Sequence, residues 1–207
     1  EKIGEMLTHL DQIGLTDNTI IIFQSDHGHS TEERTFHGGG SAGIYRGAKG
    51  CLFEGGIRVP SIVTLPGVIP ENQVRDQMVT GVDWFPTLAE FCGIELPGHH
   101  IDGKSIKDVI LDNGANSPHD TFYWQLGKGK TPEWVVREGN WKLHGNPKDN
   151  SQKAPITKND KLFLANLAMD PTEMTNLAFK YPEVVKRLSD LQSEYDSSIQ
   201  QTLQSER

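Results

Sequence analysis

Apolar residues recur along the first part of the chain in two patterns, one helical and one strand-like. In residues 3–14 they lie three or four positions apart, which predicts an amphipathic helix that ends at Gly14. Residues 19–23 form a continuous apolar and β-branched run, which predicts a buried strand of a parallel sheet. A helix, a short turn and a strand in this order indicate part of an α/β fold.

The following segments continue this alternation. Residues 59–65 have the composition of a second strand. Residues 83–92 have helical spacing, with Asp83 as a candidate N-cap and Gly93 as the residue that ends the helix. A turn then leads into a short predicted helix over residues 105–111.

The pattern changes after residues 112–119, a polar segment that is typical of a linker. Short β-rich segments separated by turns then predict an antiparallel sheet. These segments span residues 121–126, 134–138, 141–144 and 162–167. Residues 182–203 carry apolar positions along one side, which predicts a long helix. We therefore predict two domains, an α/β domain over 1–118 and a small α+β subdomain over 119–207.

Composition excludes some functions. The 207 residues include 35% hydrophobic residues, and no apolar run is long enough to cross a membrane. Lys and Arg number 20 against 28 Asp and Glu, and the resulting net charge of −8 argues against a nucleic-acid surface. The two cysteines, Cys51 and Cys92, fit no metal-knuckle or disulfide-framework spacing, and whether they pair stays open.

Candidate chemistry begins directly after the first predicted strand, at Asp26 and His27. In open α/β sheets, functional side chains gather at the carboxyl ends of strands. Adjacent side chains on an extended strand point to opposite faces, so these two can converge only if the chain turns there. Gly28 gives the backbone that freedom. A carboxylate beside an imidazole is a plausible half of a metal site.

A glycine-rich stretch downstream carries three cations, Arg46, Lys49 and Arg58. Taken alone, such residues are more often a solvated loop, as a strand followed by Asp-His-Gly is often only a turn. Cations near a bound metal ion would repel it unless an anion lay between them. The joint pattern therefore indicates a metal-assisted reaction on an oxyanion ester, with Lys49 neutralising charge on the transferred group.

Three stretches carry a resemblance to a known family: SDHG at 25–28, RGAKG at 46–50 and LFEGGIRVP at 52–60. In this order they resemble the C-terminal half of a type I sulfatase of the alkaline-phosphatase superfamily. The stretches at 82–97, 135–144 and 164–178 extend the resemblance over nearly the whole chain. It implies part of an alkaline-phosphatase-like, mostly parallel sheet with helices, followed by an α+β subdomain with an antiparallel sheet and a long helix.

The resemblance also implies roles for single residues. Asp26 and His27 would coordinate a divalent ion, Ca²⁺ in most of the family, and Lys49 would contact the sulfate. Most members have asparagine where this chain has His27, and an imidazole favours a somewhat softer ion. Sugar or aryl contacts are expected from the loop after this turn. Its candidates are His29, Glu32, Glu33, Arg34 and His37, of which we favour His29 because it lies two residues from His27.

The family's nucleophile is a formylglycine made from a C/S-x-P-x-R motif, and an Asp-Asp pair completes its metal site. Neither motif occurs in this sequence. We therefore expect a fragment whose formylglycine lies in a missing upstream segment, and which by itself binds metal poorly and hydrolyses nothing measurable. The implied substrate is a sulfated small molecule or carbohydrate, and the implied location is periplasmic or secreted.

Two other functions stay open. Asp-His-Gly at the end of a strand also serves zinc enzymes, so a metal-dependent phosphoesterase or phosphodiesterase of the same superfamily is the first alternative. The context of Lys49 disfavours it. A non-catalytic binding module derived from a sulfatase is the second alternative, because the nucleophile motif does not occur in these residues.

Overall fold

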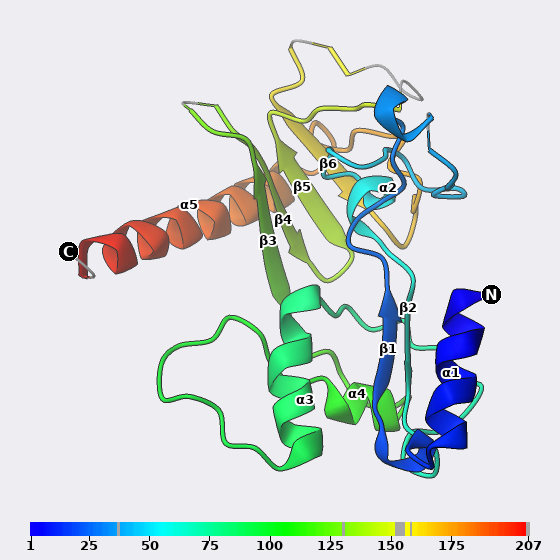
Figure 1. Ribbon diagram of the computed structural model, residues 1–207. Helices are drawn as coiled ribbons and strands as arrows, with labels where there is room; N and C mark the ends of the chain where they lie inside the picture. The colour runs from blue at the N-terminus through cyan, green and yellow to red at the C-terminus, as the bar shows by residue number, and fades with distance from the viewer. Residues whose placement is uncertain (37, 130, 152–155, 158, 206–207) are drawn as a thin grey trace. The chain divides into compact units, whose positions relative to one another are not determined.

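A computed structural model describes the protein over residues 1–36, 38–129, 131–151, 156–157 and 159–205 (Figure 1). The chain divides into two compact units, each built from two separate parts of the sequence. The first comprises Glu1–Gln24 and Ser61–Asp120, and the second comprises Ser25–Pro60 and Thr121–Arg207. All predicted site residues therefore belong to the second unit. The domain boundary predicted between residues 118 and 119 stays a prediction.

The first unit contains the helices and strands predicted for the N-terminal part of the chain. They are α1 (Lys2–Gln12), β1 (Ile21–Gln24), β2 (Ser61–Thr64), α3 (Trp84–Cys92) and α4 (Lys107–Leu111), with 3-10 turns at Thr16–Asn18 and Gly81–Asp83. Helix α3 ends at Gly93, whose φ of 65° is left-handed, as predicted from the sequence. Ile106, Val109 and Ile110 form a small core around α4.

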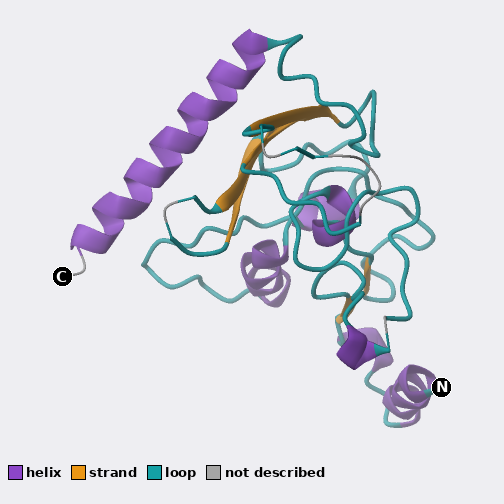
Figure 2. Cartoon of the chain, turned by 90° about the horizontal axis from the view of Figure 1, so that it is seen from above, coloured by secondary structure: helices purple, strands orange, loops and turns teal. Residues whose placement is uncertain are grey.

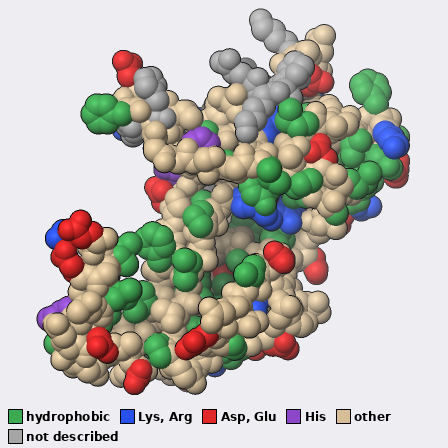
Figure 3. All heavy atoms as spheres, turned by 90° about the vertical axis from the view of Figure 1, so that its right-hand side faces the viewer, with side chains coloured by type: hydrophobic (Ala, Val, Ile, Leu, Met, Phe, Trp, Pro, Cys, Tyr) green, Lys and Arg blue, Asp and Glu red, His purple; other side chains and the backbone are tan. Residues whose placement is uncertain are grey.

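Strand β1 differs from the expectation of a buried strand in a parallel sheet. It pairs antiparallel with β2, and no further strand joins this sheet among the described residues. Phe23 and Ile62 face each other across the pair and are 54% and 63% exposed. The apolar run was recognised correctly, but burial of a strand depends on neighbours that the run itself does not specify. Hydrophobic side chains are visible on the surface of this unit in Figure 3.

The second unit is built around a four-stranded antiparallel sheet in the order β3-β4-β5-β6. Its strands are β3 (Thr121–Leu126), β4 (Glu133–Glu138), β5 (Trp141–Gly145) and β6 (Leu162–Asn166). All four predicted strands are thus confirmed to within a residue. The predicted long helix is α5 (Pro182–Ser205), which lies across one face of this sheet (Figures 1 and 2). The short helix α2 (Glu54–Ile57) and the 3-10 turn Glu33–Thr35 belong to the inserted segment 25–60.

Alternation along these strands gives the sheet two different faces. Toward α5, Leu143 and its neighbours Val136 and Leu164 pack with Leu188 in an apolar core. On the opposite face, the Phe53 ring stacks on His144 at 4.3 Å and meets Phe163 edge-on at 5.5 Å. The segment that carries the predicted site therefore packs on the second face.

The fold class is confirmed as mixed α/β with a C-terminal antiparallel sheet and a long helix. Among the residues that the structure describes, no helix combines the length and the apolar character needed to span a membrane.

Candidate active site

The turn after β1 brings the Asp26 and His27 side chains together. Ser25 Oγ donates a hydrogen bond to the His27 carbonyl at 2.8 Å, and the Gly28 N–H donates to the Gly56 carbonyl at 2.9 Å. A Cβ at Gly28 would lie 2.0 Å from the Gly55 carbonyl oxygen, so only glycine fits this approach. As a result, Asp26 Oδ2 lies 3.0 Å from His27 Nε2.

Hydrogen bonding at the other ring nitrogen of His27 shows that Nδ1 carries a proton. His27 Nδ1 lies 2.7 Å from the Gly28 carbonyl oxygen, so Nδ1 carries a proton and donates it. In a neutral ring Nε2 is then an unprotonated acceptor, and it faces the Asp26 carboxylate, which is also an acceptor. Two acceptors 3.0 Å apart require a proton or a cation between them. An imidazole held through its other nitrogen by a carbonyl is the usual arrangement of a metal-binding histidine.

These donors fit a divalent cation only in part. A carboxylate oxygen and an imidazole nitrogen suit calcium or a softer divalent ion, but calcium takes about six to eight ligands. No group of three or more His, Cys, Asp or Glu side chains is arranged to hold a metal among the described residues. The Asp26 side chain is 81% exposed, which leaves it open to ligands from elsewhere. Asp26 and His27 therefore supply at most two ligands of such a site.

Lys49 lies beside this turn because two glycines bend the chain on either side of it. Gly47 and Gly50 have φ of 88° and 89°, the left-handed region where glycine is favoured. Between them, the Lys49 N–H donates to the His29 carbonyl at 3.0 Å. This bond holds the Lys49 backbone against the residues that immediately follow His27.

The Lys49 ammonium is paired with an acidic residue of the neighbouring loop. Lys49 Nζ lies 3.5 Å from Glu32 Oε2, and Arg34 Nε donates to the same oxygen at 2.8 Å. The hydrogen bond from Arg34 and the charge of Lys49 lower the pKa of Glu32. A carboxylate thus sits between two cations in an exposed loop, which shows that the Lys49 amine can reach and hold an oxyanion.

His29, the predicted substrate contact, is half-buried. Its Nδ1 is buried and has no hydrogen-bond partner among the described residues. The Gly40 backbone packs against its side chain, since a Cβ there would lie 2.6 Å from His29 Cβ. His37, another of the loop candidates, lies outside the described residues.

A buried charged cluster, not predicted from the sequence, lies beneath this site. Lys142 Nζ lies 2.9 Å from Glu54 Oε1 and 3.0 Å from Glu173 Oε1, and His144 Nε2 lies 3.0 Å from that same Glu173 oxygen. Lys142, His144 and Glu173 are fully buried. Burial, the largest single influence, opposes ionisation of Glu173, but Lys142, His144 and the Glu54 N–H together outweigh it and lower the pKa of this carboxyl to about 2.

Arg46 continues the cluster toward the Lys49 loop. Its Nε donates to Asp149 Oδ2 at 2.9 Å, and its guanidinium lies over the Phe53 ring, 4.1 Å from the centroid. Burial by itself would raise the pKa of Asp149, yet hydrogen bonds from Ser151 and Arg46 lower it. The sequence identified Arg46 as a possible anion ligand, but the structure buries it completely and pairs it internally.

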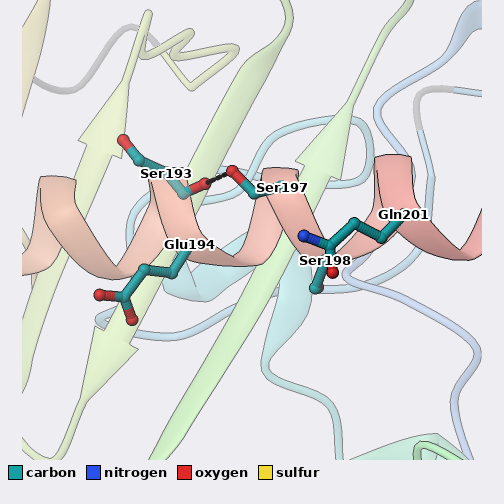
Figure 4. A pocket seen from close by; sticks show the side chains of 5 residues that line it. All are labelled: Ser193, Glu194, Ser197, Ser198 and Gln201. Atoms are coloured by element: carbon teal, nitrogen blue, oxygen red, sulfur yellow. Dashed lines mark hydrogen bonds between the residues drawn. The ribbon is translucent and has the colours of Figure 1, made fainter.

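Two other features carry no chemistry of this kind. Both cysteines are free, and burial raises the pKa of the Cys51 thiol, which disfavours the nucleophilic thiolate. A hollow on α5 is lined by side chains of that helix alone (Figure 4). They are Ser193, Glu194, Ser197, Ser198 and Gln201. The Ser197 hydroxyl donates to the Ser193 carbonyl, an ordinary contact within a helix, and the hollow holds one ionisable group.

Comparison with known proteins agrees with the resemblance seen in the sequence. The family model described as Sulfatase matches residues 1–94. Arylsulfatase A of Bos taurus is 30% identical over 217 aligned positions, which cover 95% of this chain and 42% of the bovine protein. The chain spans less than half the length of the curated relatives it matches.

Solved structures give the same result. One from work on glycosaminoglycan metabolism by Bacteroides thetaiotaomicron is 28% identical with a TM-score of 0.74, covering 94% of this chain and 42% of that one. Another, described in complex with its substrate D-glucosamine-2-N,6-O-disulfate, is 25% identical with a TM-score of 0.67. The match covers 94% of this chain and 37% of the chain in that structure.

Proposed function

The chain belongs to the sulfatase family, and we propose that residues 25–60 supply the metal-binding and sulfate-binding side of a sulfate ester hydrolase site. One observation carries the proposal. Asp26 Oδ2 and His27 Nε2 face each other at 3.0 Å while the opposite ring nitrogen is committed to the Gly28 carbonyl. A proton or a metal ion between the two acceptors explains this arrangement, and the family to which the chain belongs favours the metal ion.

Each residue then has a separate task. Asp26 and His27 hold one side of a divalent ion, and that ion, when bound, would withdraw electron density from the sulfuryl oxygens. Lys49, in the neighbouring loop, binds the sulfate group of the same ester and neutralises negative charge that develops on it. In the absence of substrate, the Glu32 carboxylate pairs with the Lys49 amine. When substrate binds, its sulfate group replaces the carboxylate, since carboxylate and sulfate are both oxyanions.

The nucleophile is not among these residues. The sequence has no C/S-x-P-x-R motif from which a formylglycine could form, and the Cys51 thiol is buried with a raised pKa. The 207-residue chain by itself should therefore bind sulfate without hydrolysing its esters. The substrate class proposed here is a sulfated carbohydrate or a sulfated small molecule, with His29 as a contact, in a periplasmic or secreted setting.

An NMR titration of the isotope-labelled chain tests the binding half of the proposal. Two ligands bind calcium only weakly, so calcium chloride should shift resonances of Asp26 and His27 only at high concentration. Sodium sulfate added afterwards should shift the backbone amide resonances of residues 48 and 49 with saturation. Lys49→Met should lose the sulfate response and keep the calcium response. The matched control is Lys161→Met, because Lys161 is an exposed lysine of the same unit. An unchanged sulfate response in Lys49→Met would overturn the proposal.

Activity can be tested by exchange with a relative. Residues 1–207 would replace the aligned part of bovine arylsulfatase A, and the hybrid would be assayed with an aryl sulfate and the matching aryl phosphate. We expect turnover of the sulfate ester that Lys49→Ala reduces at least about a hundredfold. A hybrid that shows a native thermal transition and cleaves only the phosphate ester would support the phosphoesterase instead.

A further inference from the structure

The loop of residues 46–54, which we call the Lys49 loop, is closed at its base by its own backbone. The Gly55 N–H donates to the Arg46 carbonyl at 2.7 Å, so the two ends of the loop lie side by side. The side chains that hold it, however, come from residues about a hundred positions further along the chain. They reach it from the C-terminal segments of the same unit.

Glu173 binds both ends of the Lys49 loop. Its Oε2 accepts a hydrogen bond from the Glu54 N–H at 2.6 Å, and its backbone carbonyl accepts one from Arg46 Nη1 at 2.7 Å. Its other carboxylate oxygen faces Lys142 and His144 at 3.0 Å each. Glu173 also has a φ of 52°, which is uncommon for a residue other than glycine. Such a conformation persists where surrounding contacts fix it, as these four do.

Asn150 binds the tip of the same loop. Its Oδ1 accepts from the Ala48 N–H at 3.0 Å, and its Nδ2 donates to the Lys49 carbonyl at 2.7 Å. The same amide nitrogen lies 3.4 Å from the Ala48 carbonyl. One side chain thus hydrogen-bonds the backbone on both sides of the Ala48–Lys49 peptide, between the two glycines that bend the chain.

We propose that Glu173 and Asn150 are positioning residues for Lys49, Glu173 fixing the base of its loop and Asn150 fixing its tip. Lysine side chains are flexible, so the place of the ammonium depends on how firmly the backbone beneath it is held. Functional groups need support from a second layer of contacts to keep their geometry. The role in sulfate binding rests on the proposed function, whereas the ordering of the loop does not.

Amide hydrogen exchange measures the loop directly, because the Lys49 N–H is hydrogen-bonded to the His29 carbonyl. In Asn150→Ala, loss of the hydrogen bonds between this side chain and the loop backbone should speed exchange at Lys49 by about 5- to 30-fold. The response of Lys49 to sulfate should weaken by a similar factor. Asn140→Ala is the matched control, since Asn140 is an exposed turn residue of the same unit. It should leave both measurements unchanged.

Glu173→Gln tests the base of the loop while keeping the shape of the side chain. We expect faster exchange at Lys49 and at Glu54, whose N–H the carboxylate binds. Exchange at Leu188 in α5 reports global unfolding. An acceleration at Lys49 and Glu54 that exceeds the acceleration at Leu188 would separate loop release from global unfolding.

The outcomes distinguish the two proposals. Unchanged Lys49 exchange in both variants overturns the positioning role, whatever the chain does with sulfate. Accelerated exchange in a chain that shows no sulfate response in its native form supports the positioning role and overturns the proposed function. Accelerated exchange together with weakened sulfate binding supports both.

Discussion

Leu143 and Lys142 are neighbours on β5 and are equally buried, yet they lie on opposite faces of the sheet. Leu143 packs with apolar side chains from α5, whereas Lys142 contacts two carboxylates, those of Glu54 and Glu173. The first face is held by non-directional burial of apolar area. The second is held by hydrogen bonds of defined length and direction.

This difference assigns the two faces different tasks. Apolar burial provides most of the stability of a domain and tolerates exchange of one aliphatic side chain for another. Buried ion pairs contribute little net stability because desolvation opposes their attraction, but they fix the groups that they join. Here the joined groups are the base of the Lys49 loop and the sheet, so the charged face orients the candidate site.

The largest expected effect comes from removing the centre of the charged face. Glu173→Ala leaves the buried Lys142 ammonium with one of its two carboxylates. We expect a loss of about 3–5 kcal/mol in the free energy of unfolding, because the variant removes one partner of a buried ion pair together with the hydrogen bonds that its carboxylate accepts. Urea denaturation followed by circular dichroism measures it.

A double variant sharpens this test. Lys142→Met in the Glu173→Ala background removes the buried ammonium that has lost one of its two carboxylates. It should restore part of the lost stability, so the two effects should not add. If the losses of stability in the two single variants simply summed in the double variant, Glu173 and Lys142 would contribute independently, and this would contradict the account of the charged face.

A comparable loss is expected from the apolar face, without the effect on the site. Leu188→Ala deletes a fully buried side chain of α5 from the core that contains Leu143. We expect a loss of about 2–5 kcal/mol in the free energy of unfolding from lost burial and the cavity left behind. The Lys49 resonances should respond to sulfate as in the native chain. A weakened response would show that the two faces are not independent.

The smallest expected effect is the pH dependence of the charged face. The pKa of Glu173 is lowered from its ordinary value of 4.5 to about 2, so its contribution is complete above pH 4.5 and lost as pH falls toward 2. The loss amounts to at most about 3 kcal/mol. Glu133 acts in the opposite direction, because burial raises its pKa and protonation at low pH relieves that cost. Denaturation curves at pH 6 and pH 3 should differ less in Glu173→Ala than in the native chain.

Much of the architecture followed from the sequence because it depends on local patterns. The short β-rich segments at residues 134–138 and 141–144, separated by a turn, and the one-sided apolar spacing after Pro182 predicted β4, β5 and α5 nearly to the residue. The parallel pairing expected for β1 did not hold, since a strand's partner is decided by distant residues. Gly28 likewise predicted the turn that joins Asp26 and His27, while their binding of a metal stays a prediction.

The charged face could not be predicted because its pairs are far apart in the chain. Lys142 meets Glu54 across 88 positions, and Asn150 meets Ala48 across 102. Judged from its sequence neighbours alone, Lys142 is a polar residue in a strand where apolar and polar residues alternate, and such residues usually face solvent. Only the tertiary structure shows that a second layer covers that face.

The central claim is that one anion is bound jointly by the Asp26–His27 turn and by Lys49. The most direct measurement is the ¹⁵N shift of the Lys49 Nζ ammonium during a sulfate titration in the presence of Ca²⁺, in the native chain and in Asp26→Asn. We predict a saturable shift in the native chain that is strongly reduced in Asp26→Asn, because the metal side of the site is lost. A saturable shift of equal size in both chains would contradict the claim.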